Sequence, residues 1–368
     1  MNILFVHDHF FKKYKNDYYS NGKLTYKQLS YYLNFGEQVQ VISRFREVDN
    51  KIDKSYKSNG ENINILGLPG VLSKKGLINR TFLISELERE INNADLIILR
   101  LPSEFGILVH KIAFKKNKKI LVEMVASPFD CLWHRGDLLG KLYAPILSLR
   151  TKKTLLDAEN VIYVTSEFLQ SKYPTNGNSV AISDARVKVV NKIRNINLDK
   201  RIRIGVIGNP ALKLKGIETL FNTFLKLDAE RYELSIVGGA LDSSLEKQMS
   251  GYQNIEQLGF ISDRNKLNDW FSSIDIYIQP SLTEGLPRSI IEAMSFGLPV
   301  IGSRVGGIPE IVDSSMVFPP KNHEQLLSKV KMLSEPSVYS NLSQYSLDVA
   351  SRFDESLDKK KNDFIKSI

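Results

Sequence analysis

The chain has 368 residues, 42% of them hydrophobic and 25% charged, and its 50 Lys and Arg exceed its 41 Asp and Glu to give a net charge of +9. The length predicts about two domains, and the composition excludes disordered, collagen-like and disulfide-rich classes of protein. Cys131 is the only cysteine, which excludes an intramolecular disulfide and a thiolate metal cluster. Because no run of about 18 apolar residues occurs, we expect no transmembrane span. The first apolar run, 3–6, is short and the charged Asp8 follows it closely, so no secretory signal is expected, and the single cysteine suits the reducing cytosol of a cytoplasmic protein.

Short runs rich in Ile, Val and Leu alternate with longer mixed segments, which is the pattern of parallel βαβ units. In the first half, strands are expected at 3–6, 39–43, 63–66, 96–100, 120–125 and 161–164, and helices at 24–34, 81–92, 105–115 and 138–156. The pattern then starts again. In the second half, strands are expected at 202–207, 234–237, 255–258, 274–278 and 299–301, and helices at 217–227, 263–272 and 288–296.

A polar and charged stretch at 191–200 separates the two series and marks the predicted domain boundary. We therefore predict an α/β fold of two doubly wound, Rossmann-like domains, at 1–195 and 200–345, which face a central cleft. Ligands of such sheets bind at the carboxyl ends of the strands. Residues 346–368 are expected to form a helical segment that packs across the domains and frays at its end, near Lys361.

The excess positive charge lies entirely in the first half. Residues 1–199 carry 30 Lys and Arg against 20 Asp and Glu, whereas residues 200–368 carry 20 against 21. One interpretation is a solvated surface. The other is attraction of the first domain to an anionic membrane, where each basic residue typically contributes about 1 kcal/mol. Nucleic acid is not expected as a partner, because no nucleic-acid-binding motif accompanies the charge.

The most informative stretch is 279–301, which combines a strand end, a loop and a helix start. Gly285 allows a close backbone approach, and Pro287 suits the first helical position. The free N–H groups of that first turn form a site for a phosphate or diphosphate, to which Arg288 can add a charge-assisted contact. Glu292 has apolar neighbours. Its carboxylate therefore either pairs with Arg288, four residues earlier, or faces a cleft and accepts hydrogen bonds from a ribose diol.

Glu284 and Glu292, separated by seven residues, are followed by Gly-Leu-Pro-Val-Ile at 297–301 and Gly-Gly-Ile-Pro-Glu at 306–310. This pattern resembles the signature of family-four retaining glycosyltransferases of the GT-B fold. The likeness extends to the phosphate-binding and base-binding loops, represented here by Gly208, Lys215, Gly259 and Phe260. The first half is similar, more loosely, to the acceptor domains of bacterial capsule and surface-polysaccharide enzymes of that group.

The resemblance implies a role for each matching residue of the second half. Glu284 would contact hydroxyls of the donor sugar, and Glu292 would bind the ribose of the nucleotide. The backbone N–H groups of Gly285 and Leu286 would hold the diphosphate.

Asn209 departs from the pattern, because many relatives carry an Arg there. Lys215, aided by Lys213, is then left as the cation that stabilises the charge developing on the leaving diphosphate. No cofactor or metal is expected beside the nucleotide sugar, because no Asp-x-Asp triplet occurs and the five histidines are scattered.

On the acceptor side, Glu123 interrupts the apolar run 120–125. Its carboxylate is either a satisfied core group or a cleft group. In relatives, a polar residue at a strand end of the first domain lies beside the reacting sugar carbon, so the resemblance implies that Glu123 in the cleft would be catalytic together with Glu284 and Lys215. His7 and His9 follow the first expected strand and should point toward the cleft. The other residues expected on this side are Gly22, Arg100 and His134.

Together these features predict a retaining glycosyltransferase that moves a hexose or N-acetylhexosamine from a nucleotide sugar, with UDP-sugars expected ahead of GDP-sugars. The expected acceptor is a lipid-linked saccharide in capsule, O-antigen or exopolysaccharide synthesis, at the inner face of the cytoplasmic membrane. Two alternatives stay open. One is a sugar-nucleotide 2-epimerase of the same architecture, which would not need a basic acceptor domain. The other is a non-catalytic, nucleotide-sugar-binding scaffold, which is suggested only by Asn209.

Overall fold

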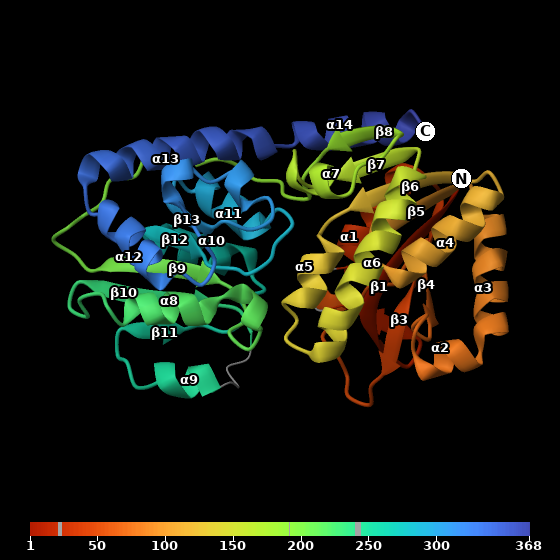
Figure 1. Cartoon of the computed structure of the whole chain (residues 1–368), viewed down its shortest axis with the longest axis horizontal. Helices are drawn as coiled ribbons and strands as arrows, with labels where there is room; N and C mark the ends of the chain where they lie inside the picture. Colours follow the sequence, from red (N-terminus) through yellow and green to blue (C-terminus); the bar gives the residue numbers. More distant parts are fainter. Residues whose placement is uncertain (21–23, 191, 240–243) are drawn as a thin grey trace.

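The structure is a computed structural model that describes residues 1–20, 24–190, 192–239 and 244–368. Two α/β domains lie side by side, the first coloured red to yellow-green and the second green to blue (Figure 1). Each is built on a largely parallel sheet with helices packed on it. The predicted architecture of two doubly wound domains is therefore confirmed.

The first sheet has the strand order β4-β3-β1-β5-β6-β7-β8, and β2 pairs antiparallel with β1. Its central strands are the apolar runs seen in the sequence, as expected for strands that are buried on both faces. The strands are β1 (Asn2–Tyr14), β2 (Asp17–Tyr19), β3 (Gln38–Glu47), β4 (Ile63–Leu68), β5 (Leu96–Leu101), β6 (Lys119–Met124), β7 (Asn160–Tyr163) and β8 (Asn178–Ala181).

Helices cover both faces of this sheet. The long helices α3, α4 and α6 pack on one face and bury a core of leucine, isoleucine and valine side chains. The α-helices of this domain are α1 (Tyr26–Leu29), α2 (Lys74–Ile78), α3 (Arg80–Asn93), α4 (Glu104–Lys115), α5 (Pro128–Trp133), α6 (Leu138–Leu156) and α7 (Phe168–Lys172).

Strand β1 is longer than the sequence predicts. It does not end at residue 6 but continues to Tyr14, because β3 resumes parallel pairing with it at Phe10 after an irregularity. The hydroxyl of Ser43 on β3 donates to the carbonyl oxygens of both His7 and His9, at 2.6 Å each, and so bridges the irregular segment. The expectation that His7 and His9 follow the strand is therefore wrong, since both lie within it.

The second sheet has the order β11-β10-β9-β12-β13-β14 and is parallel throughout. Its strands are β9 (Ile202–Ile207), β10 (Tyr232–Val237), β11 (Ile255–Gln257), β12 (Ile276–Gln279), β13 (Val300–Ser303) and β14 (Val317–Phe318). Its helices are α8 (Ile217–Phe224), α9 (Ser244–Met249), α10 (Arg264–Ser273), α11 (Arg288–Ser295) and α12 (His323–Met332). The sequence patterns missed β14, α9 and α12.

The two C-terminal helices run along one side of both domains (Figure 1). Helix α13 (Pro336–Ala350) packs on the second domain, where the Tyr339 hydroxyl donates to the carbonyl oxygen of Asp275 at 2.8 Å. Helix α14 (Ser356–Lys366) lies on the first domain and buries Ile365 in its core. Lys361 is only 6% exposed, so the expectation that this end of the chain frays is wrong.

Among the described residues, no helix combines the length and the hydropathy that crossing a bilayer requires.

Candidate active site

The loops that follow β9, β10 and β11 meet at the carboxyl edge of the second sheet. The N–H of Gly238 donates to the carbonyl oxygen of Gly259 at 2.6 Å. A methyl group on Gly238 would lie 2.9 Å from the carbonyl oxygen of Gly208, closer than real contacts allow. The expected phosphate-binding and base-binding loops therefore pack against each other, and side chains larger than glycine would separate them.

The loop after β9 is also tied to the loop after β12. Gly216 adopts a φ of +65°, and a methyl group there would overlap the carbonyl oxygen of Pro280. The N–H of Leu282 donates to the carbonyl oxygen of Leu214 at 2.7 Å. These two contacts place Lys215 opposite the loop that carries Glu284.

Lys215 and Glu284 form an ion pair, with 2.7 Å between Nζ and Oε1. The same carboxylate oxygen accepts hydrogen bonds from Ser281 Oγ at 2.7 Å and from Gln279 Nε2 at 3.3 Å. The Glu284 side chain is 13% exposed, so three donors hold it in one orientation. Sequence reasoning missed Ser281 and Gln279, although both are polar residues at or just after the end of the apolar strand β12 and lie within five positions of Glu284.

Asn209, which stands in place of the usual Arg, stabilises the turn in which it lies. Its Oδ1 accepts a hydrogen bond from the N–H of Ala211 at 2.9 Å, the pattern of an Asx turn. Lys213 lies in the same loop with an exposed side chain. Of the two lysines expected to act as the cation, the structure brings Lys215 to Glu284.

Helix α11 begins at Arg288, and Pro287 is its N-cap, one position earlier in the helix numbering than expected. The Arg288 side chain is exposed, and the positive end of the helix dipole lies directly after the Glu284 loop. A diphosphate placed at this helix start would be near both Lys215 and free backbone donors.

Glu292 does not pair with Arg288. Its carboxylate instead meets Arg264, at the start of α10, with 2.7 Å between the guanidinium and Oε1. The Glu292 side chain is 23% exposed, so a ligand hydroxyl can still reach it. No sequence signal pointed to Arg264, because it lies on a different helix, 28 positions before Glu292.

The two domains meet at Gly285. A methyl group on this residue would overlap the carbonyl oxygen of Val125 at the end of β6, so only glycine fits against the first domain. The next residue, Leu286, packs against the hydrophobic cores of both domains. The N–H of Gly307 donates to the carbonyl oxygen of Gly285 at 2.7 Å and fixes the loop from the other side.

Glu310 adds a second link between the domains. Its carboxylate accepts hydrogen bonds from the N–H groups of Ser166 at 2.6 Å and Phe168 at 2.8 Å, at the start of α7. A carboxylate at a helix N-terminus satisfies unpaired donors and interacts favourably with the helix dipole. The Gly-Gly-Ile-Pro-Glu run thus holds the Gly285 loop through Gly307 and the first domain through Glu310.

Helix α5 of the first domain lies opposite the loop that carries Glu284. Burial, and next the charges of Asp130 and Glu284, raise the pKa of the Cys131 thiol to about 11. His134 is the C-cap of α5; burial lowers its pKa, Asp130 opposes this, and Lys321 of the second domain lowers it further. Cys131 and His134 therefore lie on the part of the first domain that faces the second domain.

Of the two interpretations of Glu123, a core group or a cleft group, the structure shows the core group. It is 2% exposed, and its carboxylate meets the Tyr32 hydroxyl at 2.9 Å, Arg100 at 2.9 Å and Lys361 at 2.8 Å. Burial raises the pKa of Glu123, but Lys361 and Arg100 outweigh it, so the pKa lies below its ordinary value. Arg100 also pairs with Asp184. We therefore leave Glu123 and Arg100 out of the groups proposed to touch substrate.

The two N-terminal histidines have partners of their own. His7 Nδ1 lies 3.0 Å from the carbonyl oxygen of Arg100, and burial together with the Arg100 charge lowers the pKa of His7 to about 3. A neutral His7 therefore donates its Nδ1–H to that carbonyl. His9 Nε2 lies 2.9 Å from the Ser20 hydroxyl. Gly22, expected near the diphosphate, lies outside the described residues.

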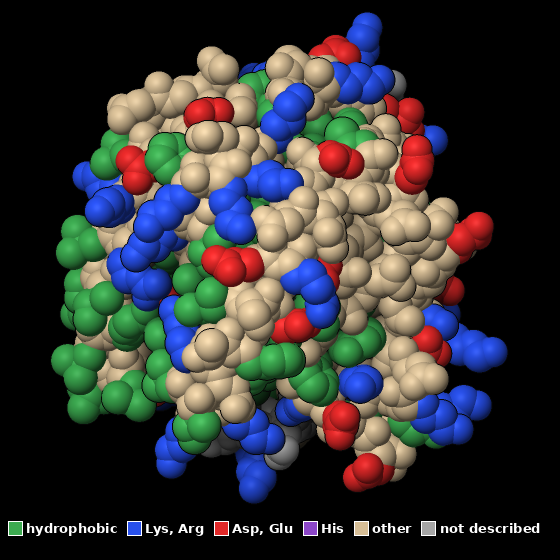
Figure 2. All heavy atoms as spheres, turned by 90° about the vertical axis from the view of Figure 1, so that its right-hand side faces the viewer, with side chains coloured by type: hydrophobic (Ala, Val, Ile, Leu, Met, Phe, Trp, Pro, Cys, Tyr) green, Lys and Arg blue, Asp and Glu red, His purple; other side chains and the backbone are tan. Residues whose placement is uncertain are grey.

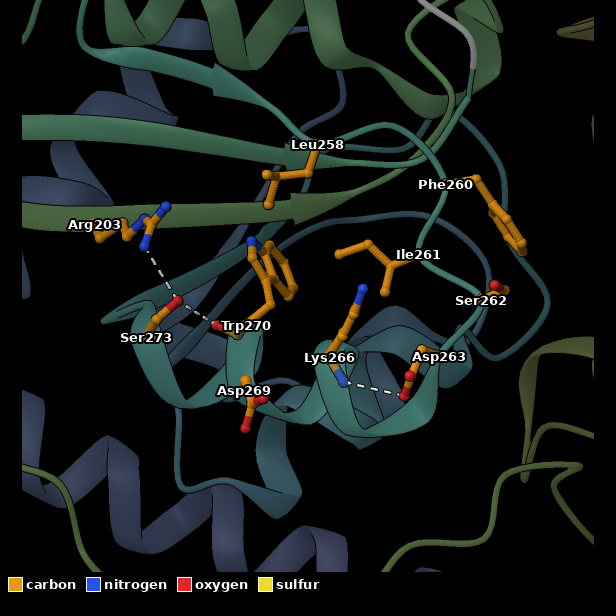
Figure 3. Close-up of a pocket in the computed structure, with 10 residues that line it drawn as sticks. All are labelled: Arg203, Leu258, Phe260, Ile261, Ser262, Asp263, Lys266, Asp269, Trp270 and Ser273. Carbon is orange, nitrogen blue, oxygen red and sulfur yellow. Dashed lines mark hydrogen bonds between the residues drawn. The ribbon is translucent and has the colours of Figure 1, made fainter.

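A groove of about 590 Å³ runs along α10, beside the edge strand β11. Figure 3 shows Phe260 at one end of it, with Arg203 and Ser273 at the other. Phe260 is 61% exposed, so its ring is free to contact a ligand. The residues that line this groove do not include Glu284, Lys215 or Glu292. The groove therefore meets the expected site only at the base-binding loop.

In the part of the chain that the structure describes, no three His, Cys, Asp or Glu side chains are grouped so that they could hold a metal ion. The expectation that the reaction needs neither metal nor cofactor stays a prediction.

The fold and this edge define a class of protein: two parallel-sheet domains of the GT-B type. Anabaena Alr3699/HepE in complex with UDP superposes with a TM-score of 0.70 at 15% identity over 100% of both chains, and its UDP-glucose complex does so with a TM-score of 0.68. WaaG, a glycosyltransferase involved in lipopolysaccharide biosynthesis, gives a TM-score of 0.65 at 15% identity over 99% of both chains.

Sequence comparison identifies the family. Residues 201–335 match the family described as Glycosyl transferases group 1. Protein CapJ of Staphylococcus aureus is 34% identical over 364 residues, which cover 95% of this chain and 92% of CapJ. The chain therefore belongs to the group 1 glycosyltransferases, and the predicted family and nucleotide-sugar transferase activity are confirmed.

Proposed function

We propose that this glycosyltransferase moves a hexose or N-acetylhexosamine from a UDP-sugar to a lipid-linked saccharide, with retention of the anomeric configuration. The acceptor would belong to the synthesis of a surface polysaccharide, and the protein would work at the inner, anionic face of the cytoplasmic membrane. The UDP and UDP-glucose complexes of the HepE structures support the choice of donor. The net positive charge of the first half supports the membrane location.

The observation that carries the proposal is the Lys215–Glu284 pair beside the start of α11. In the transfer, the acceptor hydroxyl oxygen bonds to the anomeric carbon and the bond from that carbon to the diphosphate breaks. Its electron pair leaves with the diphosphate, which also takes up the hydroxyl proton. Lys215 and the backbone donors of α11 are positioned to stabilise the negative charge that develops on the leaving group.

Glu284 would bind the donor sugar. Lys215, Ser281 and Gln279 fix its carboxylate at the cleft, where it can accept hydrogen bonds from sugar hydroxyls. When a diphosphate binds, Lys215 can turn from Glu284 to the phosphate oxygens. The carboxylate is then free to accept from the sugar while Ser281 keeps it in place.

Glu292 would bind the ribose of the nucleotide. Its carboxylate lies one helical turn beyond Arg288, and it is held by Arg264. A carboxylate accepts hydrogen bonds from both hydroxyls of a ribose. The exposed Phe260 ring would then be available to the base.

The test uses the full chain with a panel of UDP-sugars and GDP-sugars and with synthetic lipid-diphosphate saccharides. We expect transfer from a UDP-sugar, and NMR of the product should show the anomeric configuration of the donor. An inverted product would refute retention. Release of an epimerised nucleotide sugar without acceptor would identify an epimerase. Nucleotide binding with no turnover on any acceptor would identify a non-catalytic scaffold.

A further inference from the structure

Helix α6 carries apolar side chains on both of its faces. Its inner face buries Ala144, Leu147 and Leu155 against the first domain. Its outer face presents five large side chains that are 50% to 76% exposed: Leu138, Leu139, Leu142, Ile146 and Leu149. We call these five residues the α6 stripe. A surface helix ordinarily turns a polar face to water, so an apolar outer face indicates that something covers it.

The charges on α6 are all of one sign. The 19 residues from Leu138 to Leu156 include Lys141, Arg150, Lys152 and Lys153 but no Asp or Glu. Arg150 is neutralised by Glu104 at 2.8 Å, whereas Lys141, Lys152 and Lys153 are exposed next to the stripe. Exposed leucines flanked by lysines, without acidic residues, are the composition of a helix that lies in the interface of an anionic bilayer.

An aromatic residue lies at the N-terminal end of the stripe. Trp133, the last residue of α5, is 43% exposed, and Lys141 Nζ lies 5.9 Å from the centre of its ring. Phe129 stacks on it with 5.3 Å between the ring centres. Tryptophan is enriched at the level of lipid headgroups, where its ring is partly apolar and its N–H stays hydrated.

The space-filling view agrees with this composition. Figure 2 shows hydrophobic side chains gathered along the left edge of the molecule, with Lys and Arg side chains beside them. That edge is the side that faces the viewer in Figure 1, where α6 lies in front of the sheet. Exposed apolar side chains of α2 and α3, among them Leu77, Ile78 and Phe82, enlarge the apolar surface of this domain.

We propose that the α6 stripe inserts into the interface of an anionic bilayer, with Lys141, Lys152 and Lys153 on the headgroups. Helix α5 lies four residues before α6, and its Cys131 is near Thr283 in the loop that carries Glu284. This orientation would therefore place the membrane surface beside the proposed acceptor side of the site. The proposal deepens the proposed function, since it gives the surface by which a lipid-linked acceptor would reach the site. The inserted surface itself does not depend on that function.

The test measures flotation of the full chain with vesicles of phosphatidylcholine alone and of phosphatidylcholine with phosphatidylglycerol. The stripe variant carries Leu139→Ser, Leu142→Ser and Ile146→Ser. A matched control carries Leu198→Ser, Leu225→Ser and Met332→Ser, three exposed apolar side chains outside the first domain. We expect the stripe variant to lose at least about tenfold in affinity for the anionic vesicles, and the control to bind like wild type.

Charge variants separate the electrostatic contribution to vesicle binding from the contribution of the α6 stripe. Lys152→Gln with Lys153→Gln should weaken binding to anionic vesicles and reduce its dependence on salt, whereas Lys200→Gln with Lys331→Gln should have little effect. All variants change exposed side chains, so their thermal unfolding midpoints should match wild type. UDP affinity, measured without vesicles, should also be unchanged.

Three results would overturn the proposal. One is equal vesicle binding by wild type and the stripe variant, and another is equal loss in the stripe variant and its control. The third is a wild-type dimer in sedimentation velocity that the stripe variant dissolves, which would make the stripe an interface between copies of the chain. Absence of UDP binding by wild type would refute the proposed function while leaving the vesicle result standing.

Discussion

Lys361 and Glu123 form a buried ion pair, with 2.8 Å between Nζ and Oε1, that joins the C-terminal helix α14 to strand β6 of the first domain. The chain reaches this contact after it has completed the second domain, so the last helix fastens the two domains to each other. Tyr32 and Arg100 also bind Glu123 and satisfy its remaining acceptor positions. Breaking this pair should therefore loosen the whole molecule.

Lys361→Met should lower the free energy of unfolding by about 3 kcal/mol, because it leaves a buried carboxylate short of one partner. The double variant Lys361→Met with Glu123→Gln should recover part of this loss, since a neutral amide needs no cation. Lys359→Met, at an exposed position of the same helix, is the control. Urea unfolding measures all three. A loss in Lys359→Met as large as that in Lys361→Met would mean that helix composition, and not the ion pair, is responsible.

The low pKa of His7 predicts a dependence of stability on pH. The folded protein holds His7 neutral down to about pH 3, whereas an unfolded histidine takes up a proton below about pH 6.5. The contribution of His7 is therefore complete above pH 6.5 and declines as the pH falls toward 3. His7→Asn keeps a donor for the Arg100 carbonyl but cannot titrate. Its loss of stability between pH 7.5 and 5.5 should be smaller than that of wild type by about 1 kcal/mol, and identical losses would contradict the assignment.

Glu292→Gln should weaken UDP binding by about tenfold or more, because hydrogen bonds to a charged acceptor are worth about 1.5–3 kcal/mol. Arg264→Ala should weaken it less, since it removes the partner of Glu292 but leaves the carboxylate. Glu218→Gln, at an exposed position on α8, is the control for lost charge. Isothermal titration with UDP measures the three affinities. Equal affinities in wild type and Glu292→Gln would refute the ribose role.

Glu284→Gln should act on turnover more than on binding. Its carboxylate faces the sugar in our proposal, so the variant should bind UDP almost as tightly as wild type and lose about a hundredfold in turnover. Ser281→Ala, which removes one of the three donors to Glu284, should lose less. Steady-state transfer from a UDP-sugar measures turnover, and UDP titration measures binding. A parallel loss of UDP affinity would place Glu284 on the nucleotide instead.

Gly285→Ala should disturb the contact between the domains. The added methyl group would overlap the carbonyl oxygen of Val125, so the loop or the first domain has to move. We expect turnover to fall at least about tenfold, because small displacements of reacting groups are costly. UDP, which we propose to bind on the second domain, should still bind. Gly251→Ala is the matched control, since its methyl group would meet only Gln248, at 3.9 Å. Wild-type turnover in Gly285→Ala would show that the domains do not need this close approach.

Local pattern predicted most of the framework. The strands β9, β10, β12 and β13 are buried on both faces, so each appears in the sequence as a largely apolar run that predicts a strand. The extension of β1 was not predictable in the same way. Its second part, residues 7–14, mixes histidine, aspartate and lysine with aromatic residues without regular alternation, and it is a strand because β3 pairs with it.

In the candidate site too, some features could be predicted from local sequence and others depend on contacts between distant segments. The residues from Glu284 to Glu292 could be recognised in the sequence, because one loop and the start of one helix carry them all. Their partners became known from the fold. Lys215, Arg264 and Val125 reach them from other elements, and long-range contacts of this kind leave no local pattern.

Lys361 shows the same limit most plainly. As one of three consecutive lysines near the end of the chain, it has the local character of a solvated tail. Its burial depends on its ion pair with Glu123. The sequence shows that Glu123, a carboxylate inside an apolar strand, needs a partner, but it does not show that Lys361 is that partner. Composition and periodicity predicted the two domains, and the motif from Glu284 to Glu310 indicated the family and the loop expected to bind the donor. Packing between distant segments decided which charges are core and which remain free for substrate, because a charge is stable inside a protein only where the fold brings it a partner.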